Sequence, residues 1–123
     1  EGAFESLRAH GFRKQNILRK DVPGSYELTL GAKWMATRKD IQAVICLGCV
    51  IQGDTPHFDY ICQAVAYGIT QVNLDTNKPV IFGVLTTLTK KQALERAGGK
   101  LGNKGEEAAL TAIGMLELQA SIK

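Results

Sequence analysis

Ala43-Val-Ile-Cys-Leu-Gly-Cys-Val-Ile51 is an almost unbroken apolar run, and it decides the fold class of this chain. A strand buried on both faces has this pattern, because neither face has to carry polar side chains. The run predicts a strand over 41–50, and a second apolar run predicts another over 78–85. Strands of this kind belong to a mostly parallel sheet that is covered by helices.

Helices are expected before, between and after these strands. After a polar loop at 52–56, apolar side chains at Ile61, Val65, Ile69 and Val72 recur every three or four positions, which predicts a helix over 57–72. The other expected elements are a helix over 3–10 ended by Gly11, a short strand over 16–22, a helix from an N-cap at Ser25 to Arg38, a helix from an N-cap at Thr89 to Ala97, and a helix over 106–121.

The alternation of strand and helix predicts an α/β fold of three layers, with helices on both faces of the sheet. The length of 123 residues fits one domain over 1–123. Ligands of such sheets bind beyond the carboxyl ends of the strands, here at the loops 23–27, 51–57 and 85–89. Because parallel strands need a crossover between them, a strand should precede the first helix. We therefore expect a chain that is truncated at its N-terminus.

Composition excludes several classes of protein. The net charge is only +3, and the basic residues are scattered rather than gathered as in a nucleic-acid-binding face. No apolar stretch reaches the roughly 20 residues that cross a bilayer, and no signal peptide opens the sequence, so a cytoplasmic protein is expected.

The three cysteines are expected to be free thiols. Cys46 and Cys49 form a Cys-x-x-Cys pattern, but residues three apart on a strand point to opposite faces and cannot share a metal ion. Both are therefore predicted to be small apolar residues of the buried strand, and no metal site is predicted.

Three features carry candidate chemistry. His57 lies where a strand-end loop enters a helix, a place suited to a general acid–base, although a lone histidine there is more often an ordinary helix residue. Asp54 and Thr55 precede the same helix, where they either offer backbone N–H groups to an anion or only cap the helix. Arg96 and Lys104 flank a glycine-rich stretch at 98–105, which is either a connector or a phosphate-binding turn. These residues alone predict a small α/β domain that binds a phosphate-bearing metabolite.

Five motifs taken together resemble the lumazine synthase family, in that family's order and across essentially the whole chain. They are Val22-Pro-Gly-Ser-Tyr-Glu27, Gly53-Asp-Thr-Pro-His-Phe-Asp-Tyr60, Phe82-Gly-Val-Leu-Thr86, Gln92-Ala-Leu-Glu-Arg-Ala-Gly98 and Gly102-Asn-Lys-Gly-Glu-Glu-Ala108. The resemblance implies a flavodoxin-like sheet and no metal or organic cofactor. It also implies condensation of 5-amino-6-(D-ribitylamino)uracil with 3,4-dihydroxy-2-butanone 4-phosphate. The products would be 6,7-dimethyl-8-ribityllumazine, phosphate and water, in riboflavin biosynthesis.

The resemblance also implies residue roles. His57 matches the proton-transfer residue of the family, and Arg96 matches the residue that pairs with the phosphate. The implied substrate-binding residues are Ser25, Tyr26 and Glu27 for the ribityl chain, Cys49, Val50 and Ile51 for the pyrimidine, Asp54 and Thr55 for the phosphate, Phe82 for the ring system, and Lys104 near the ribityl and phosphate groups.

Two departures from the family pattern stand out. Tyr26 occupies a position where many members carry tryptophan, which preserves a flat amphipathic side chain. The opening strand of the family, whose Arg-Phe-Asn-type segment stacks an aromatic ring on the pyrimidine, is absent from this sequence.

The resemblance implies partners as well. Lumazine synthases form pentamers, and some assemble into icosahedral 60-mers, so copies of this chain are expected to associate; riboflavin synthase is a further implied partner. The compact glycine-rich stretch favours a shell over a lone pentamer. A second hypothesis is a non-catalytic shell or flavin-binding scaffold on the same fold. The presence of His57, Arg96 and Lys104 favours the enzyme.

Overall fold

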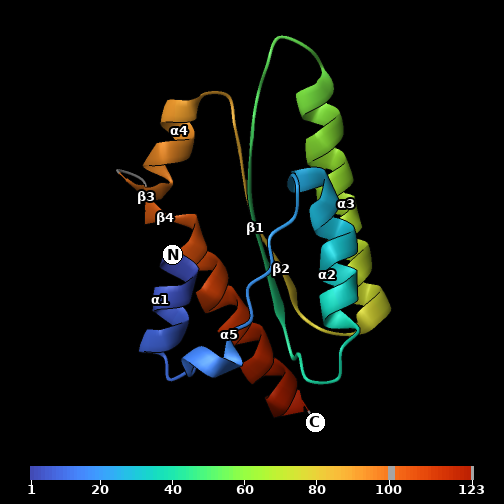
Figure 1. Cartoon of the computed structure of the whole chain (residues 1–123), viewed down its shortest axis with the longest axis vertical. Coiled ribbons are helices and arrows are strands. Elements are labelled where there is room, and N and C mark those ends of the chain that lie inside the picture. The colour runs from blue at the N-terminus through green and yellow to red at the C-terminus, as the bar shows by residue number, and fades with distance from the viewer. Residues whose placement is uncertain (100–101, 123) are drawn as a thin grey trace.

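The computed structural model describes residues 1–99 and 102–122 (Figure 1). The α-helices are α1 (Gly2–Ala9), α2 (Leu28–Ala36), α3 (His57–Thr76), α4 (Lys90–Glu95) and α5 (Lys104–Ile122). The strands are β1 (Val44–Ile51), β2 (Val80–Thr87), β3 (Ala97–Gly99) and β4 (Gly102–Asn103), and two 3₁₀ turns, η1 (Lys14–Asn16) and η2 (Ser25–Glu27), lie between the first two helices.

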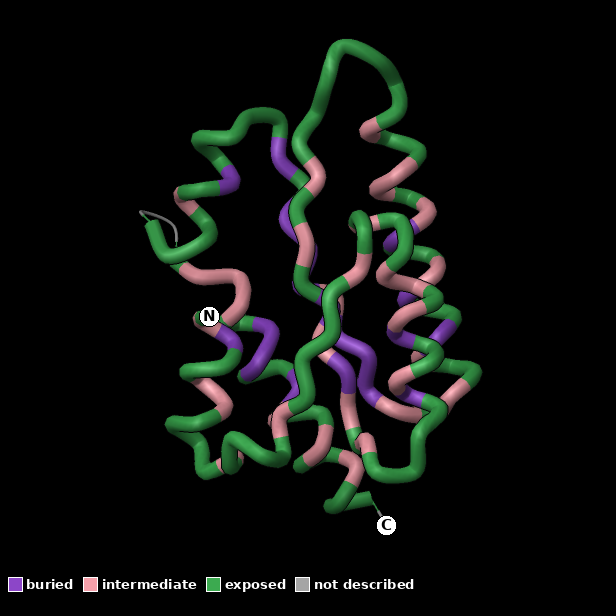
Figure 2. The backbone as a smooth tube through the Cα atoms, viewed as in Figure 1, coloured by how far each residue is buried: buried purple, intermediate pink, exposed green. Residues whose placement is uncertain are grey.

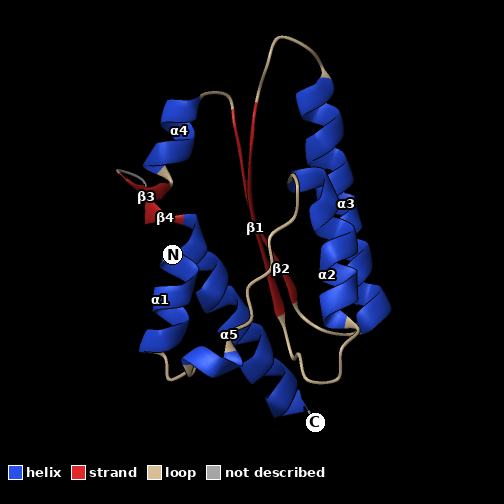
Figure 3. Ribbon diagram, in the orientation of Figure 1, coloured by secondary structure: helices blue, strands red, loops and turns tan. Residues whose placement is uncertain are grey.

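The predicted central strands form a parallel pair. β1 and β2 run in register from Val44 opposite Val80 to Ile51 opposite Thr87, so their carboxyl ends are level (Figure 3). The backbone N–H of Gln52 donates to the Thr87 carbonyl at 3.0 Å, which continues the pairing by one residue beyond β1. The loops that leave the two strands are thereby held side by side.

Helices cover both faces of this sheet, which confirms the expected α/β fold with its layers. Alternate β1 residues such as Val44 and Cys46 are buried with Val65 and Ile69 of α3, while Ala32 and Ala36 of α2 complete this cluster. On the other face, Ile81 of β2 is buried with Ala108 and Ala112 of α5 (Figures 1 and 2). The period of two along β1 therefore sorts its side chains between two cores.

The long helix α3 is fixed at its C-terminal end by one side chain. The Asn73 amide donates to the Val80 carbonyl at 2.8 Å, and its oxygen accepts from the Val80 N–H at 2.7 Å. Asn77 then ends the helix in the left-handed conformation, with a φ of 56°. These contacts fix the position of α3 along β2. Because β2 pairs with β1 in register, they also fix the amino end of α3 relative to the carboxyl end of β1.

Two predictions about the first third of the chain were wrong. The segment 16–22 is not a strand, because strand structure requires a neighbour to pair with, and in the described residues no strand pairs with this segment. Ser25 does not cap α2 either. It lies in the 3₁₀ turn η2, three residues before the helix, and its hydroxyl hydrogen-bonds to β1 instead.

A small antiparallel hairpin, β3–β4, was not predicted. It pairs Ala97 with Asn103 within the glycine-rich stretch. Gly98 and Gly102 have φ angles of 105° and 99°, which side chains with a β-carbon rarely adopt. The part of the glycine-rich prediction that falls on 100–101 lies outside the described residues.

Candidate functional site

A cavity of about 400 Å³ lies at the carboxyl end of β1, where the loop rule predicts a ligand site. It brings together three predicted groups: the η2 residues Ser25–Glu27, the last residues of β1 from Cys49 to Ile51, and the loop and helix-start residues Thr55 and His57. Gly24, Gly53, Phe58 and Ile61 also line it. Gly24 and Gly53 lie in the predicted ligand loops 23–27 and 51–57 and Phe58 in the motif 53–60, whereas Ile61 was predicted only as an apolar residue of the helix.

The turn η2 is joined directly to β1. Ser25 Oγ donates to the Cys49 carbonyl at 3.4 Å. A β-carbon on Gly48 would lie 2.9 Å from that same Ser25 oxygen, so only glycine allows the turn to approach the strand this closely. Tyr26 is 57% exposed and Glu27 is exposed, so both side chains are available to a ligand in the cavity.

His57 is the first residue of α3 and is exposed at the cavity. Its backbone N–H donates to Thr55 Oγ1 at 3.4 Å, which fixes the backbone from which the ring projects. Over 1–99 and 102–122 no hydrogen bond occupies its ring nitrogens. An imidazole in this state can exchange a proton with a bound ligand.

The loop before α3 offers donors to an anion. Within the described part of the chain, the backbone N–H groups of Gly53, Asp54 and Thr55 have no protein acceptor. Gly53 and Thr55 line the cavity, whereas Asp54 does not. Backbone N–H donors at the start of a helix attract phosphate. The Asp54 carboxylate would repel a phosphate in the cavity, but it does not line the cavity.

The three cysteines are not poised as nucleophiles. Burial in the core raises the pKa of Cys46 to about 11. Partial burial also raises the pKa of Cys49, and partial burial together with the Asp59 carboxylate raises that of Cys62. A raised pKa disfavours the reactive thiolate at neutral pH.

The burial prediction for Cys-x-x-Cys was right for Cys46 and wrong for Cys49, which is exposed. Cys49 lies on the same face of β1 as Ile45, and this face is exposed from Leu47 onward, at Leu47, Cys49 and Ile51.

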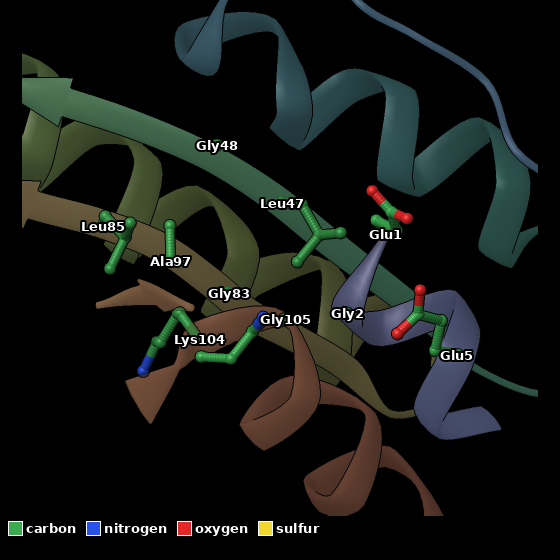
Figure 4. A pocket seen from close by; sticks show the side chains of 11 residues that line it. Glu1, Gly2, Glu5, Leu47, Gly48, Gly83, Leu85, Ala97, Lys104 and Gly105 are labelled. Carbon is green, nitrogen blue, oxygen red and sulfur yellow. The ribbon is translucent and has the colours of Figure 1, made fainter. Parts of the chain in front are cut away.

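Arg96 and Lys104 are neighbours across the base of the β3–β4 hairpin. The Lys104 N–H donates to the Arg96 carbonyl at 2.7 Å. Neither residue lines the His57 cavity. Lys104 instead borders a second hollow, of about 480 Å³, between the sheet, α1 and the start of α5. In Figure 4, Lys104 and Gly105 lie on one side of this hollow and Glu1 and Glu5 on the other.

Phe82 is also apart from the His57 cavity. It pairs with Cys46 in the middle of the sheet and packs, half-buried, against the core between the sheet and α2 and α3. One chain therefore gathers most of the predicted site residues but leaves Asp54, Phe82, Arg96 and Lys104 outside the cavity.

Two further features concern metals and membranes. Among the described residues, no three histidine, cysteine or acidic side chains are grouped as a metal site would require. None of the helices in that part of the chain is both long and apolar enough to span a bilayer.

Known proteins of one family resemble this chain over nearly its whole length. Residues 1–120 match the family model described as 6,7-dimethyl-8-ribityllumazine synthase. The chain is 66% identical over 116 residues to the 6,7-dimethyl-8-ribityllumazine synthase of Cytophaga hutchinsonii, an alignment covering 94% of this chain and 73% of that protein. It is 54% identical to the Bacteroides fragilis protein of the same name, over 99% of this chain and 85% of that protein. Identity to the Parabacteroides distasonis protein of that name is 57%, over 98% and 75%.

Proposed function

This chain belongs to the 6,7-dimethyl-8-ribityllumazine synthase family, and we propose that its reaction takes place at the cavity beside His57. It is an enzyme of riboflavin biosynthesis that joins 5-amino-6-(D-ribitylamino)uracil to 3,4-dihydroxy-2-butanone 4-phosphate. The observation that carries the location is the meeting of an exposed imidazole with the backbone N–H groups of 53–55 at the carboxyl end of a buried parallel strand, none of them bonded to an acceptor among the described residues apart from the His57 backbone.

The chemistry requires proton transfers and a phosphate leaving group. The amine of the pyrimidine attacks the butanone carbonyl, an imine forms with loss of water, phosphate is eliminated, and ring closure releases a second water. His57 takes and returns protons in these steps, since a neutral imidazole accepts and its cation donates near neutral pH. The N–H groups of 53–55 stabilise the phosphate, and the cavity holds the two reactants together.

The pyrimidine substrate occupies the part of the cavity between η2 and β1. Ser25, Tyr26 and Glu27 hold its ribityl chain, because their hydroxyl and carboxylate groups suit a polyol. The backbone of Cys49, Val50 and Ile51 faces its ring.

A second copy of the chain completes the site. Arg96 and Lys104, the proposed phosphate-binding cations, are held together but lie outside the His57 cavity of their own chain. The family implies an oligomeric assembly, so the missing cations have a source. In a ring of copies, one surface of each chain meets a different surface of the next. We assign Arg96 and Lys104 to the cavity of the neighbouring copy, whereas Phe82 stays packed in the core of its own chain.

An exposed apolar face fits such an assembly. Tyr60, Tyr67 and Leu74 are spaced seven apart along α3 and are 69%, 74% and 74% exposed; Leu30 and Trp34 of α2 are 52% and 67% exposed. Large apolar side chains gathered at a surface mark an interface. A pentamer, alone or within a 60-mer, would bury them. Association with riboflavin synthase, which consumes the lumazine, and a cytoplasmic location complete this proposal.

Substitution of Arg96 tests the phosphate assignment. Arg96→Ala should raise KM for the butanone phosphate at least about tenfold, because a two-pronged ionic contact is lost. KM for the pyrimidine should stay within about twofold of the wild-type value. Steady-state formation of the lumazine chromophore measures both constants, and Arg19→Ala, at an exposed arginine that pairs with Asp21, is the matched control. Equal losses for both substrates would refute the assignment.

A further inference from the structure

In this fold the β3–β4 hairpin holds the backbones of Arg96 and Lys104 together. The backbone bond between them fixes the chain positions but not the directions of the side chains. Those directions depend on how the hairpin is seated against α5, whose first residue is Lys104.

One side chain, Asn103, lies at the junction that seats the hairpin. Its Oδ1 accepts from the Glu106 N–H at 3.1 Å, which caps the start of α5. It belongs to β4 and pairs with Ala97, the residue after Arg96. Asn103 is therefore the residue that links the β3–β4 hairpin to α5, directly before Lys104.

Three glycines enclose the Asn103 amide. A β-carbon on Gly2 of α1 would overlap the amide, one on Gly105 would lie 3.1 Å from Oδ1, and one on Gly98 would lie 3.5 Å from Nδ2. The amide thus lies close to α1, the hairpin and α5, and it also borders the hollow of about 480 Å³. A side chain that is bonded on one edge and closely flanked by three segments has little freedom to rotate.

We infer that Asn103 is a positioning residue for phosphate binding: its capped and enclosed amide fixes the spacing of the Arg96 guanidinium and the Lys104 ammonium. The inference rests on the proposed function of that cation pair. Without the amide, α5 loses its cap, the close packing of the hairpin on Gly2 of α1 is lost, and the backbone positions of Arg96 and Lys104 are no longer fixed. Asn103 itself touches no reacting atom.

The test uses inorganic phosphate as the probe. Asn103→Ala should raise the inhibition constant of phosphate and KM for the butanone phosphate on the order of tenfold, because a small misplacement of binding groups is costly. KM for the pyrimidine should change by less than about twofold. Asn103→Ser keeps an oxygen that can cap α5 and should recover most of the phosphate affinity.

The matched control is Asn77→Ala. Asn77, like Asn103, is an asparagine at a helix terminus. It lies at the C-terminal end of α3, near the amino end of β2 and away from the site. A loss of phosphate affinity in both variants, or in neither, would overturn the role of Asn103. In the Arg96→Ala background, Asn103→Ala should weaken phosphate inhibition less than it does in the wild-type background, because residues that act through one another are not additive. Additive losses would also overturn it.

Two results separate this inference from the proposed function. If Arg96→Ala leaves phosphate inhibition unchanged, the assignment of the cation pair fails, and the role of Asn103 fails with it. If Arg96→Ala weakens inhibition while folded Asn103→Ala behaves like Asn77→Ala, only the inference fails. Should Asn103→Ala not fold, Gly2→Ala provides the same comparison, because its methyl group displaces the amide without removing it. Wild-type phosphate inhibition in folded Gly2→Ala would then refute the inference.

Discussion

His57 illustrates how much of the site depends on the place of a single residue in the chain. It follows Pro56 and opens α3, so its ring leaves the helix at the mouth of the cavity rather than along a packed face. The only other histidine, His10, ends α1, and its Nδ1 lies 2.8 Å from the Ser6 carbonyl. One imidazole is engaged by its own helix, and the other is available to a ligand.

Substituting these two histidines should separate their roles. His57→Ala should slow lumazine formation by about 100-fold or more, because general acid–base catalysis contributes that much. His10→Ala should leave the rate within about twofold of wild type, and far-ultraviolet circular dichroism should show both variants folded. Stopped-flow absorbance of the product measures the rates. A His57→Ala enzyme with the wild-type rate would remove His57 from the mechanism.

Because Cys46 is buried, the free energy of unfolding should fall at alkaline pH. Its folded-state pKa of about 11 lies above the ordinary value of 9.0, because the core disfavours the thiolate. A raised pKa means that this stabilisation is complete below pH 9 and is lost as the pH rises towards 11. We expect a loss of roughly 2 kcal/mol in the free energy of unfolding over that interval. Urea titrations should show a shallower loss for Cys46→Ala, and parallel curves for the two proteins would contradict the account.

At the scale of elements, the sequence predicted what periodicity can specify. Apolar runs identified β1 and β2, and the three-to-four spacing of Val65, Ile69 and Val72 identified α3. Elements that depend on a distant partner were missed. The segment 16–22 carries strand-like residues and has no pairing partner in the described structure, and β3–β4 depends on positive φ angles that leave no apolar pattern. The sequence predicts Ser25 as a helix cap, but its hydroxyl bonds to β1 instead, because Gly48 has no side chain to crowd it there.

The contact between α2 and α3 depends on one glycine. A β-carbon on Gly68 would overlap the Thr29 side chain, whereas one on Gly114 of α5 would meet no atom within 4 Å. Alanine favours the helix at both positions by about 0.5–1 kcal/mol. Gly114→Ala should therefore stabilise the protein, while Gly68→Ala should destabilise it by about 1–3 kcal/mol, since overpacking outweighs helix propensity. Chemical denaturation measures both changes, and stabilisation by Gly68→Ala would contradict the packing described.

At the scale of the whole molecule, the predicted site divides into two parts. Residues 25–27, 49–51, 55 and 57 meet in one cavity, because the loop after β1 and the turn η2 lie at the same sheet edge. Topology predicts that meeting from sequence alone. Arg96 and Lys104 meet each other and not the cavity. Sequence reasoning could not foresee the division, because a motif records which residues a site needs and not which copy of the chain supplies them.

Complementation between two impaired variants tests the central claim, a site completed by a second copy. At a butanone phosphate concentration well below the wild-type KM, His57→Ala and Arg96→Ala are each expected to be slow, and their mixed oligomers, made by co-expression, contain copies that retain the residue the other lacks. If Arg96 acts in the cavity of a neighbouring copy, about one site in four in an equal mixture regains both residues. The mixture should then form lumazine at up to about a quarter of the wild-type rate. A mixture no more active than its separate components would contradict the account.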